Sequence, residues 1–299
     1  MKVTITGTSG FVGKNLLPYL QNLQLDTATI SRTELDLPIS FKNELAIIHL
    51  AGKAHDLKKS ANPTEYYKVN FELTKKLYDT FLKSEAKRFI FVSSVKAAAD
   101  NIDGVLTEDI APNPQTDYGK SKLMAEKYIQ SQPLPEGKSF YILRPCMIHG
   151  PGNKGNLNLL YKFVQKGIPY PLASFENKRS FLSIENLCFV IANLLSKDIS
   201  SGVYNVADDD ALSTNEVVGI LAISMSKKAK LWAIPNKLIR GLAKIGDIFK
   251  LPLNSERLNK LTENYVVSNA KIKKALGVSL PLKVRDGLII TAKSFQNNS

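Results

Sequence analysis

The chain has 299 residues, 44% of them hydrophobic, and a chain of this length buries about 75% of its unfolded surface on folding. We therefore expect a globular protein and exclude a disordered tail. Forty basic against 27 acidic side chains leave a formal net charge of +13, which suits a polyanionic ligand without identifying one. Two cysteines are too few for a disulfide framework. The sequence also shows no export signal and no long apolar span, so we expect a cytoplasmic protein.

Short apolar runs alternate with longer amphipathic stretches over the first two thirds of the chain. This alternation predicts an α/β protein with a doubly wound, Rossmann-type parallel sheet. The expected strands lie at residues 2–6, 27–31, 46–50, 88–93 and 139–143, each apolar enough to be buried on both faces. Helical spacing of apolar residues predicts flanking helices at 11–23, 65–84 and 118–130.

The sequence changes character after Pro145, where closely spaced glycines at 150–155 predict a loop. The expected organisation is a dinucleotide-binding domain at 1–150, to which 185–206 return, and a smaller mixed α/β substrate-binding cap at 151–184 and 207–299. Within the cap, residues 232–251 are basic and amphipathic. We interpret them as a packed helix with a solvated basic face, and weak peripheral association with a membrane is the alternative.

Three glycines, each separated by two residues, follow the first expected strand and open the first helix. Missing side chains let backbone amides approach a pyrophosphate, and the amino end of the helix favours its negative charge. This turn predicts a dinucleotide site with contacts from Gly7, Ser9, Gly10, Phe11, Val12 and Gly13.

A tyrosine and a lysine, Tyr118 and Lys122, lie four residues apart on an expected helix and therefore share one face. Oxidation of an alcohol needs a base beside the oxygen and a hydride acceptor beside the carbon. A phenol serves as that base if a neighbouring ammonium lowers its pKa from about 10. Ser94, at the end of the strand at 88–93, completes the predicted catalytic set.

Together these motifs resemble the extended short-chain dehydrogenase/reductases, the NAD(P)-dependent nucleotide-sugar epimerase/dehydratase family. Further matching blocks are 49–52, 69–70, 107–108, 143–152, 179–181 and 275–277. Residues 93–96, 156–157 and 177–180 resemble the UDP-glucose 4-epimerase-like subgroup, which includes 4-reductases of UDP-4-keto-6-deoxyhexosamines used for surface polysaccharides.

The resemblance implies roles for individual residues. Lys122 also holds the nicotinamide ribose, and Ser94 bonds the reacting oxygen. Further cofactor contacts are implied at Leu50, Ala51, Gly52, Asn70 and Pro145, and substrate contacts at Asn156 and Arg179, the latter gripping the diphosphate. A homodimer through the helices at 65–84 and 118–130 is also implied.

Cofactor choice is expected to depend on the end of the second strand, which reads Ser31-Arg32 where NAD-selective relatives carry an acidic residue. A hydroxyl and a guanidinium can bind a 2′-phosphate, so NADP(H) is favoured over NAD(H). The connection from Arg32 to Ala46 is short for the family and leaves Asp36 and Leu37 as the expected adenine contacts.

Val95 and Lys96 stand where 4,6-dehydratases carry an Asp-Glu pair, so dehydration is not expected. The preferred function is a UDP-4-ketohexose(amine) 4-reductase, and the alternative is a UDP-hexose 4-epimerase that retains NAD. A second alternative is a non-catalytic dinucleotide-sensing or RNA-binding relative, although no aromatic and basic run typical of nucleic-acid binding occurs. Three scattered histidines predict no metal site, and His49 is expected to be structural or to line the sugar pocket.

Overall fold

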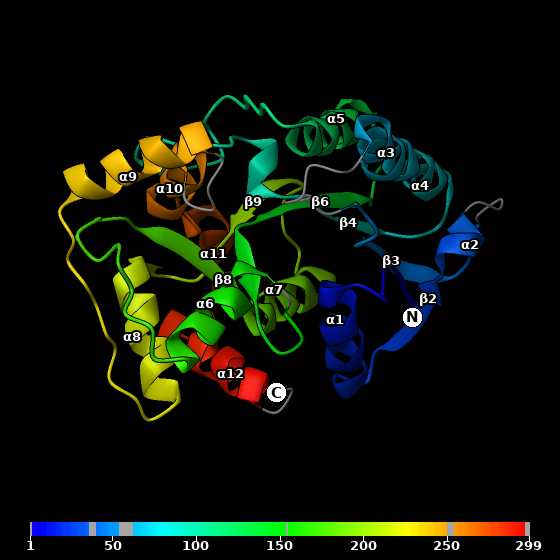
Figure 1. The fold of residues 1–299 in the computed structure, drawn as a ribbon. Helices are drawn as coiled ribbons and strands as arrows, with labels where there is room; N and C mark the ends of the chain where they lie inside the picture. The colour runs from blue at the N-terminus through cyan, green and yellow to red at the C-terminus, as the bar shows by residue number, and fades with distance from the viewer. Residues whose placement is uncertain (1, 36–39, 54–61, 154, 250–253, 297–299) are drawn as a thin grey trace.

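A parallel six-stranded sheet forms the centre of the computed structural model, which describes residues 2–35, 40–53, 62–153, 155–249 and 254–296 (Figure 1). Its strands, in spatial order, are β2 (Asp26–Ile30), β1 (Lys2–Thr6), β3 (Glu44–His49), β4 (Arg88–Val92), β6 (Ser139–Pro145) and β9 (Gly202–Val206). Each neighbouring pair is parallel. The predicted doubly wound, Rossmann-type sheet is confirmed.

Helices cover both faces of this sheet, as buried parallel strands require. One face carries α1 (Phe11–Asn22), α7 (Ile184–Ser196) and α11 (Ala270–Leu276), and the other carries α3 (Pro63–Tyr67), a π-helical segment (Lys68–Glu72), α4 (Leu73–Lys83) and α5 (Asp117–Ser131). Consecutive strand residues alternate between two cores. Ile48 packs with Leu16 of α1, whereas Ile47 packs with Leu77 of α4.

The predicted smaller mixed cap is also present and has a core of its own, which includes Leu157, Tyr161, Leu221 and Leu288. Its helices are α6 (Asn156–Gln165), α8 (Thr214–Ser224), α9 (Asn236–Phe249), α10 (Ser255–Thr262) and α12 (Val284–Gln296). A three-stranded sheet has the order β10 (Ala211–Leu212), β8 (Arg179–Ser183) and β7 (Met147–His149). A two-stranded sheet pairs β11 (Val266–Val267) with β5 (Val105–Leu106).

The structure departs from the expected elements at one place and agrees with a specific expectation at another. The helix expected at 65–84 is interrupted by the π-helical segment, which carries the buried polar side chain of Asn70. Single π turns are a common way to place such a residue at a functional site. After β2 the chain forms α2 (Arg32–Leu35), a single turn, which fits the expectation that the short connection to β3 omits a full crossover helix.

Candidate active site

The predicted cofactor residues meet at the carboxyl edge of the central sheet. Strands β2 and β3 lie on opposite sides of β1, so the chain connections diverge there and leave a crevice at the strand ends. Gly7 follows β1, Leu50 follows β3, Ser94 follows β4 by one residue, and Pro145 is the last residue of β6. The topology therefore collects residues that are up to 138 positions apart in the sequence at one edge.

The turn between β1 and α1 requires glycine for two separate reasons. Gly7 has a φ of +75°, and a Cβ there would lie 2.5 Å from the amide nitrogen of Ala51. A Cβ on Gly13 would lie 2.4 Å from Cα of Thr8, so only glycine lets α1 pack this closely against the turn. No side chain caps α1 at Gly10. The first amides of α1, from Phe11 onwards, are consequently well suited to hold a diphosphate.

The end of β3 is fixed by a buried hydrogen-bond chain. The Ala51 amide donates to Oγ1 of Thr6 at 3.2 Å, and that hydroxyl contacts Nδ1 of His49 at 2.8 Å. Nε2 of His49 contacts Oγ1 of Thr74 at 3.0 Å. Burial and the nearby Lys122 charge lower the pKa of His49 to about 3, so the ring stays neutral. The sequence predicts that His49 is either structural or lines the sugar pocket, and these buried contacts support the structural role.

Gly52, Asn70 and Lys122 come together beside this strand end. A Cβ on Gly52 would lie 3.0 Å from Oδ1 of Asn70 and 3.1 Å from Nζ of Lys122. Asn70 accepts from the amide of Lys53 at 2.8 Å and donates to Oγ of Ser121 at 3.1 Å. The π-helical segment thereby ties the β3 end to α5, and the absence of a side chain at Gly52 lets Asn70 and Lys122 approach its backbone closely.

Ser94 and Tyr118 share a side-chain hydrogen bond, which places the serine hydroxyl against the phenol. Ser94 Oγ also accepts from the amide of Lys96 at 3.2 Å, so Ser94 caps the 3₁₀ turn at Val95–Ala97 and its position is fixed. The ring of Tyr66 lies edge-on to that of Tyr118, with centroids 6.1 Å apart. The neighbouring Ser93 points elsewhere, because its hydroxyl donates to Glu126 at 2.5 Å.

The acidity expected for Tyr118 does not arise from the protein groups alone. Burial raises the pKa of the phenol, the bond from Ser94 lowers it, and the net direction is upward. In the absence of a nicotinamide, Lys122 is not among the groups that shift the pKa of Tyr118, and its Nζ donates to the carbonyl of Val92 at 3.0 Å. The combined effect of Lys122 and a bound nicotinamide stays a prediction. Burial lowers the pKa of Lys122 itself to about 8, and Glu126 opposes this shift.

A buried ion pair that the sequence analysis missed lies under the site. Arg144 contacts Glu126 with Nε at 3.1 Å from both carboxylate oxygens and with Nη2 at 2.5 Å. Both side chains are buried, with relative exposures of 3% and 0%. Glu126 lies four residues after Lys122 on the expected helix. This spacing is the feature of the sequence that could have placed Glu126 on the same helix face as the candidate residues. The pair fixes α5 to β6, and Ser93 joins it from the end of β4.

The predicted substrate residues lie on the cap side of the crevice. Arg179 is the first residue of β8 and donates from Nη2 to Oε1 of Glu263 at 3.0 Å and from Nε to the Glu263 carbonyl at 3.2 Å. Its guanidinium also donates to the carbonyl of Lys260, at the end of α10. Asn156 is exposed at the start of α6. Both remain predicted substrate contacts.

The sequence predicts no carboxylate at the end of β2, but the structure brings Glu34 there. Glu34 accepts from the backbone amide of Ser31 at 2.7 Å and from its hydroxyl at 2.5 Å. The one-turn helix that begins at Arg32 explains this, since it brings the side chain three residues later back over the strand end. Of the other residues predicted here, Asp36 and Leu37 lie outside the described part of the chain.

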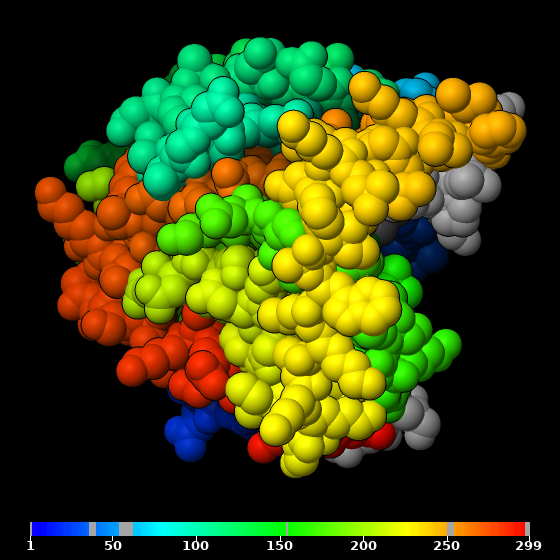
Figure 2. Space-filling view, turned by 60° about the vertical axis from the view of Figure 1, so that its left-hand side comes forward, coloured from blue at the N-terminus to red at the C-terminus, as the bar shows by residue number. Residues whose placement is uncertain are grey.

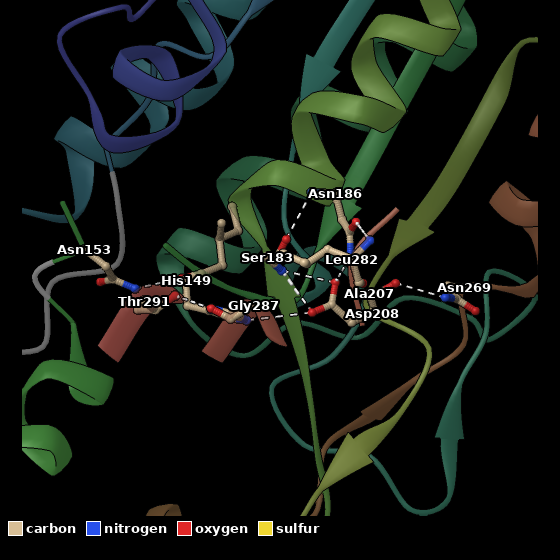
Figure 3. Close-up of polar contacts among 11 residues, drawn as sticks. His149, Asn153, Ser183, Asn186, Ala207, Asp208, Asn269, Leu282, Gly287 and Thr291 are labelled. Atoms are coloured by element: carbon tan, nitrogen blue, oxygen red, sulfur yellow. Dashed lines mark hydrogen bonds and ion pairs between the residues drawn. The ribbon is translucent and has the colours of Figure 1, made fainter. Parts of the chain in front are cut away.

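A second buried network anchors the cap behind the site (Figure 3). His149, at the end of β7, contacts Oγ1 of Thr291 of α12 through Nδ1 at 2.9 Å, and its Nε2 lies 3.7 Å from Oδ2 of Asp208. Asp208 accepts from the amide of Ser183 at 3.1 Å and from Nδ2 of Asn186 at 2.7 Å. Within the ranges that the structure describes, no cluster of three or more His, Cys, Asp or Glu side chains could hold a metal.

Comparison with known proteins accounts for this arrangement. The sequence profile of the "NAD dependent epimerase/dehydratase family" matches residues 3–207, which include the glycine turn, Ser94, Tyr118 and Lys122. The chain belongs to the NAD-dependent epimerase/dehydratase family. It is an enzyme of the nucleotide-sugar epimerase and reductase group, as the sequence resemblance implied.

Relatives of this family member cover nearly its whole length. It is 33% identical to UDP-glucose 4-epimerase of Vibrio cholerae, over 98% of this chain and 95% of the relative. It is 28% identical to N-acetyl-alpha-D-glucosaminyl-diphospho-ditrans,octacis-undecaprenol 4-epimerase of Escherichia coli O157:H7, over 91% and 84%. The structure of MoeE5 in complex with UDP-glucose and NAD has the same fold, with a TM-score of 0.78, 21% identity and coverage of 100% and 99%.

Proposed function

We propose that this enzyme oxidises and reduces C4 of a UDP-sugar with Ser94, Tyr118 and Lys122 as its catalytic residues. The observation that carries the proposal is the hydrogen bond between Ser94 and Tyr118, one helical turn from Lys122. These groups lie at the same strand edge as the glycine turn between β1 and α1. UDP as the nucleotide is supported by the names of the Vibrio cholerae relative and of the MoeE5 complex.

In the proposed mechanism Ser94 holds the C4 oxygen by a hydrogen bond while Tyr118 removes the proton from that oxygen. In the reverse direction the phenol returns the proton. A nicotinamide bound in the crevice supplies the hydride acceptor and, when oxidised, a positive charge. Because burial alone raises the pKa of Tyr118, this positive charge and that of Lys122 are needed to favour the phenolate.

Arg179 is the proposed partner of the substrate diphosphate. A planar guanidinium binds two phosphate oxygens at once, which makes it a good match for this group. Its present acceptors, Glu263 and the carbonyl of Lys260, give way as the diphosphate takes their place. Asn156 at the start of α6 is the second proposed substrate contact. A homodimer through α4 and α5 is proposed from the same resemblance.

For the net reaction we propose 4-epimerisation with a retained NAD. Glu34 is the reason for placing this above 4-ketosugar reduction, because a carboxylate beside Ser31 opposes the 2′-phosphate of NADP and suits free ribose hydroxyls. The second candidate is reduction of a UDP-4-ketosugar with NADPH. It is favoured by Arg32, which begins α2 two residues after the last residue of β2 and could supply a guanidinium to a 2′-phosphate.

The deciding experiment offers the purified protein UDP-glucose or UDP-N-acetylglucosamine without added cofactor, and separately a UDP-4-ketosugar with NADPH or NADH. Appearance of the 4-epimer supports the epimerase, whereas consumption of NADPH supports the reductase. The undecaprenyl diphosphate sugar named for the E. coli relative is a third substrate to test.

Tyr118→Phe tests the proton transfer at the C4 oxygen that the proposed epimerase and reductase reactions share. Loss of a general acid-base group lowers turnover by about 10² to 10⁴-fold, while titration with NAD shows unchanged affinity. Tyr128→Phe is the matched control, because this phenol lies on the same helix but is bonded to Asp79. Full turnover in the Tyr118 variant overturns the proposal.

A further inference from the structure

Helix α9 exposes apolar side chains that an ordinary packed helix would bury. It rests on the cap through Ile239, Ala243 and Gly246, which are four and three residues apart and form its inner face. Four exposed apolar residues recur at the same helical spacing beside that face. They are Leu238 (56% exposed), Leu242 (47%), Ile245 (47%) and Phe249 (70%). The expected packed helix with a merely basic solvated face is therefore wrong in this respect. We call these four residues with Ile248 the α9 apolar face.

The apolar surface continues into the segment that precedes α9. Leu231 is 42% exposed and Trp232 is 58% exposed. The backbone of Trp232 is nevertheless held, because its amide donates to the carbonyl of Tyr170 and its carbonyl accepts from the amide of Ala173. In Figure 2 the segment from about residue 227 to 249 runs as a continuous yellow-to-orange ridge on one side of the molecule. Exposed apolar side chains gathered along one segment of the surface mark an interaction site.

The charges around the α9 apolar face are basic. Lys237 and Lys244 are exposed on the same helix, one and a half to two turns apart, next to Ile248 in angular position. The guanidinium of Arg240 lies 5.6 Å from the ring centroid of Phe175 and so helps to hold the helix down. Asp247, the acidic residue of α9, accepts hydrogen bonds from the amide and hydroxyl of Ser255 instead of facing the lysines.

We propose that the α9 apolar face docks on the surface of a bilayer that contains anionic lipids. A helix lies in a membrane interface when a large apolar face meets the acyl boundary and lysines at its rim meet negative headgroups, and α9 carries both signals. The net charge of +13 adds attraction at longer range. Among the described helices none is long and apolar enough to cross a membrane, so the binding is peripheral.

A second copy of the chain fits this surface less well. A 14-residue helix offers a face about 21 Å long and about 10 Å wide, so two copies bury about 400 Å² together, below the roughly 1,200 Å² of a stable interface. Pairing α9 with itself also brings Lys237 and Lys244 of both copies together. Like charges in such a contact oppose association.

The docking surface is structurally linked to the candidate active site. Helix α10 packs against α9, and Leu258 of α10 shares a core with Ile239 and Ala243. The carbonyls of Lys260 and Glu263, at the other end of α10, hold Arg179. One helix therefore separates the membrane surface from the proposed diphosphate site, although docking itself does not depend on the proposed function.

Trp232 provides a direct measurement, because it is the chain's single tryptophan. The full-length protein is mixed with vesicles of phosphatidylcholine alone or with added phosphatidylglycerol, and binding is followed by sedimentation and by tryptophan emission. We expect binding to the anionic vesicles, with a blue shift of the emission and protection from acrylamide. The double variant Ile245→Gln/Phe249→Gln weakens binding by about tenfold or more, since it removes two side chains from apolar contact.

Two further variants make the test specific. Lys237→Gln/Lys244→Gln removes the preference for phosphatidylglycerol, whereas Leu159→Gln, at an apolar residue of α6 that is 67% exposed, leaves binding unchanged. Turnover of soluble substrate is the same in all variants, which shows that they fold. The proposal is overturned if vesicles are not bound or if Ile245→Gln/Phe249→Gln binds as tightly as the parent protein. A dimer abolished by that variant, without vesicle binding, assigns the face to a second copy instead.

Discussion

Arg144 and Glu126 form a fully buried ion pair one helical turn beyond Lys122 on α5. The pair joins the strand that ends at Pro145 to the helix that carries Tyr118. Because Ser93 also donates to Glu126, the ends of two strands and the helix that carries Tyr118 are held by one carboxylate. The geometry of the candidate site therefore depends on a charge that touches neither sugar nor dinucleotide.

Glu126→Gln leaves the Arg144 guanidinium buried without its counter-charge, and we expect it to lower the free energy of unfolding by about 3 to 5 kcal/mol. Urea denaturation measures this change. Glu126 also opposes the lowering of the Lys122 pKa, so its removal moves the lysine's titration further down. Glu136→Gln, at an exposed position, serves as the control and should change stability by less than about 0.5 kcal/mol. Equal stability of the two variants would contradict this account.

Gly13→Ala should reduce both stability and dinucleotide affinity. Its Cβ meets backbone atoms of Thr8 and Gly7 at 2.4 and 2.5 Å, so α1 must shift, at a cost of about 1 to 3 kcal/mol. Gly219→Ala is the matched control, because it lies within α8 with no atom near the added methyl group. That variant should gain about 0.5 to 1 kcal/mol. Thermal unfolding and NAD titration distinguish the two.

Lys122 should make the stability of the ligand-free protein depend on alkaline pH. Its pKa is about 8 when folded and 10.5 ordinarily, so between these values the unfolded chain holds a proton that the folded chain has released. Stability therefore rises with pH across this window, and the cost of the buried charge is fully present below it. Lys122→Met lacks this cost, so its advantage in stability over the parent protein should shrink from pH 8 to 10. A constant difference would show that the lysine does not titrate there.

His49 should contribute sensitivity to acid. Its pKa is lowered to about 3 in the folded protein from an ordinary 6.5. Its contribution to stability is complete above pH 6.5 and is lost as the pH falls toward 3, because only the unfolded chain takes up the proton. His49→Gln lacks this titration and should show a flatter stability curve between pH 6.5 and 4. Parallel curves for the two proteins would refute the assignment.

Local patterns predicted the sheet well. The strand at 2–6 and the helix at 118–130 agree with β1 and α5 to within one residue, because buried parallel strands and amphipathic helices have distinct apolar periods. The π-helical segment around Asn70 was not predictable in this way. Its extra residue is stabilised by contacts with Lys53 and Ser121, which are distant in the sequence.

The candidate site shows the same limit. Ser94, Tyr118 and Lys122 could be selected because motif spacing places them on one helix and one strand end. The contacts of these side chains could not be predicted from the sequence, because they join residues that only the folded sheet brings together. Glu126 contacts Arg144, and Nζ of Lys122 donates to the carbonyl of Val92. The upward direction of the Tyr118 pKa is a consequence of burial that no spacing reveals.

Tyr265 gives the cap a fixed relation to the catalytic strand end. Its hydroxyl donates to the carbonyls of Ala99 at 2.6 Å and Val95 at 3.3 Å, and its own carbonyl accepts from the amide of Ser180 at 2.9 Å. The hydroxyl of Tyr265 thus holds the stretch after Ser94, and its backbone carbonyl holds β8 at the residue after Arg179. Moving the cap away from the stretch after Ser94 would break both hydrogen bonds of the Tyr265 hydroxyl, so this one side chain couples the position of the cap to the end of β4.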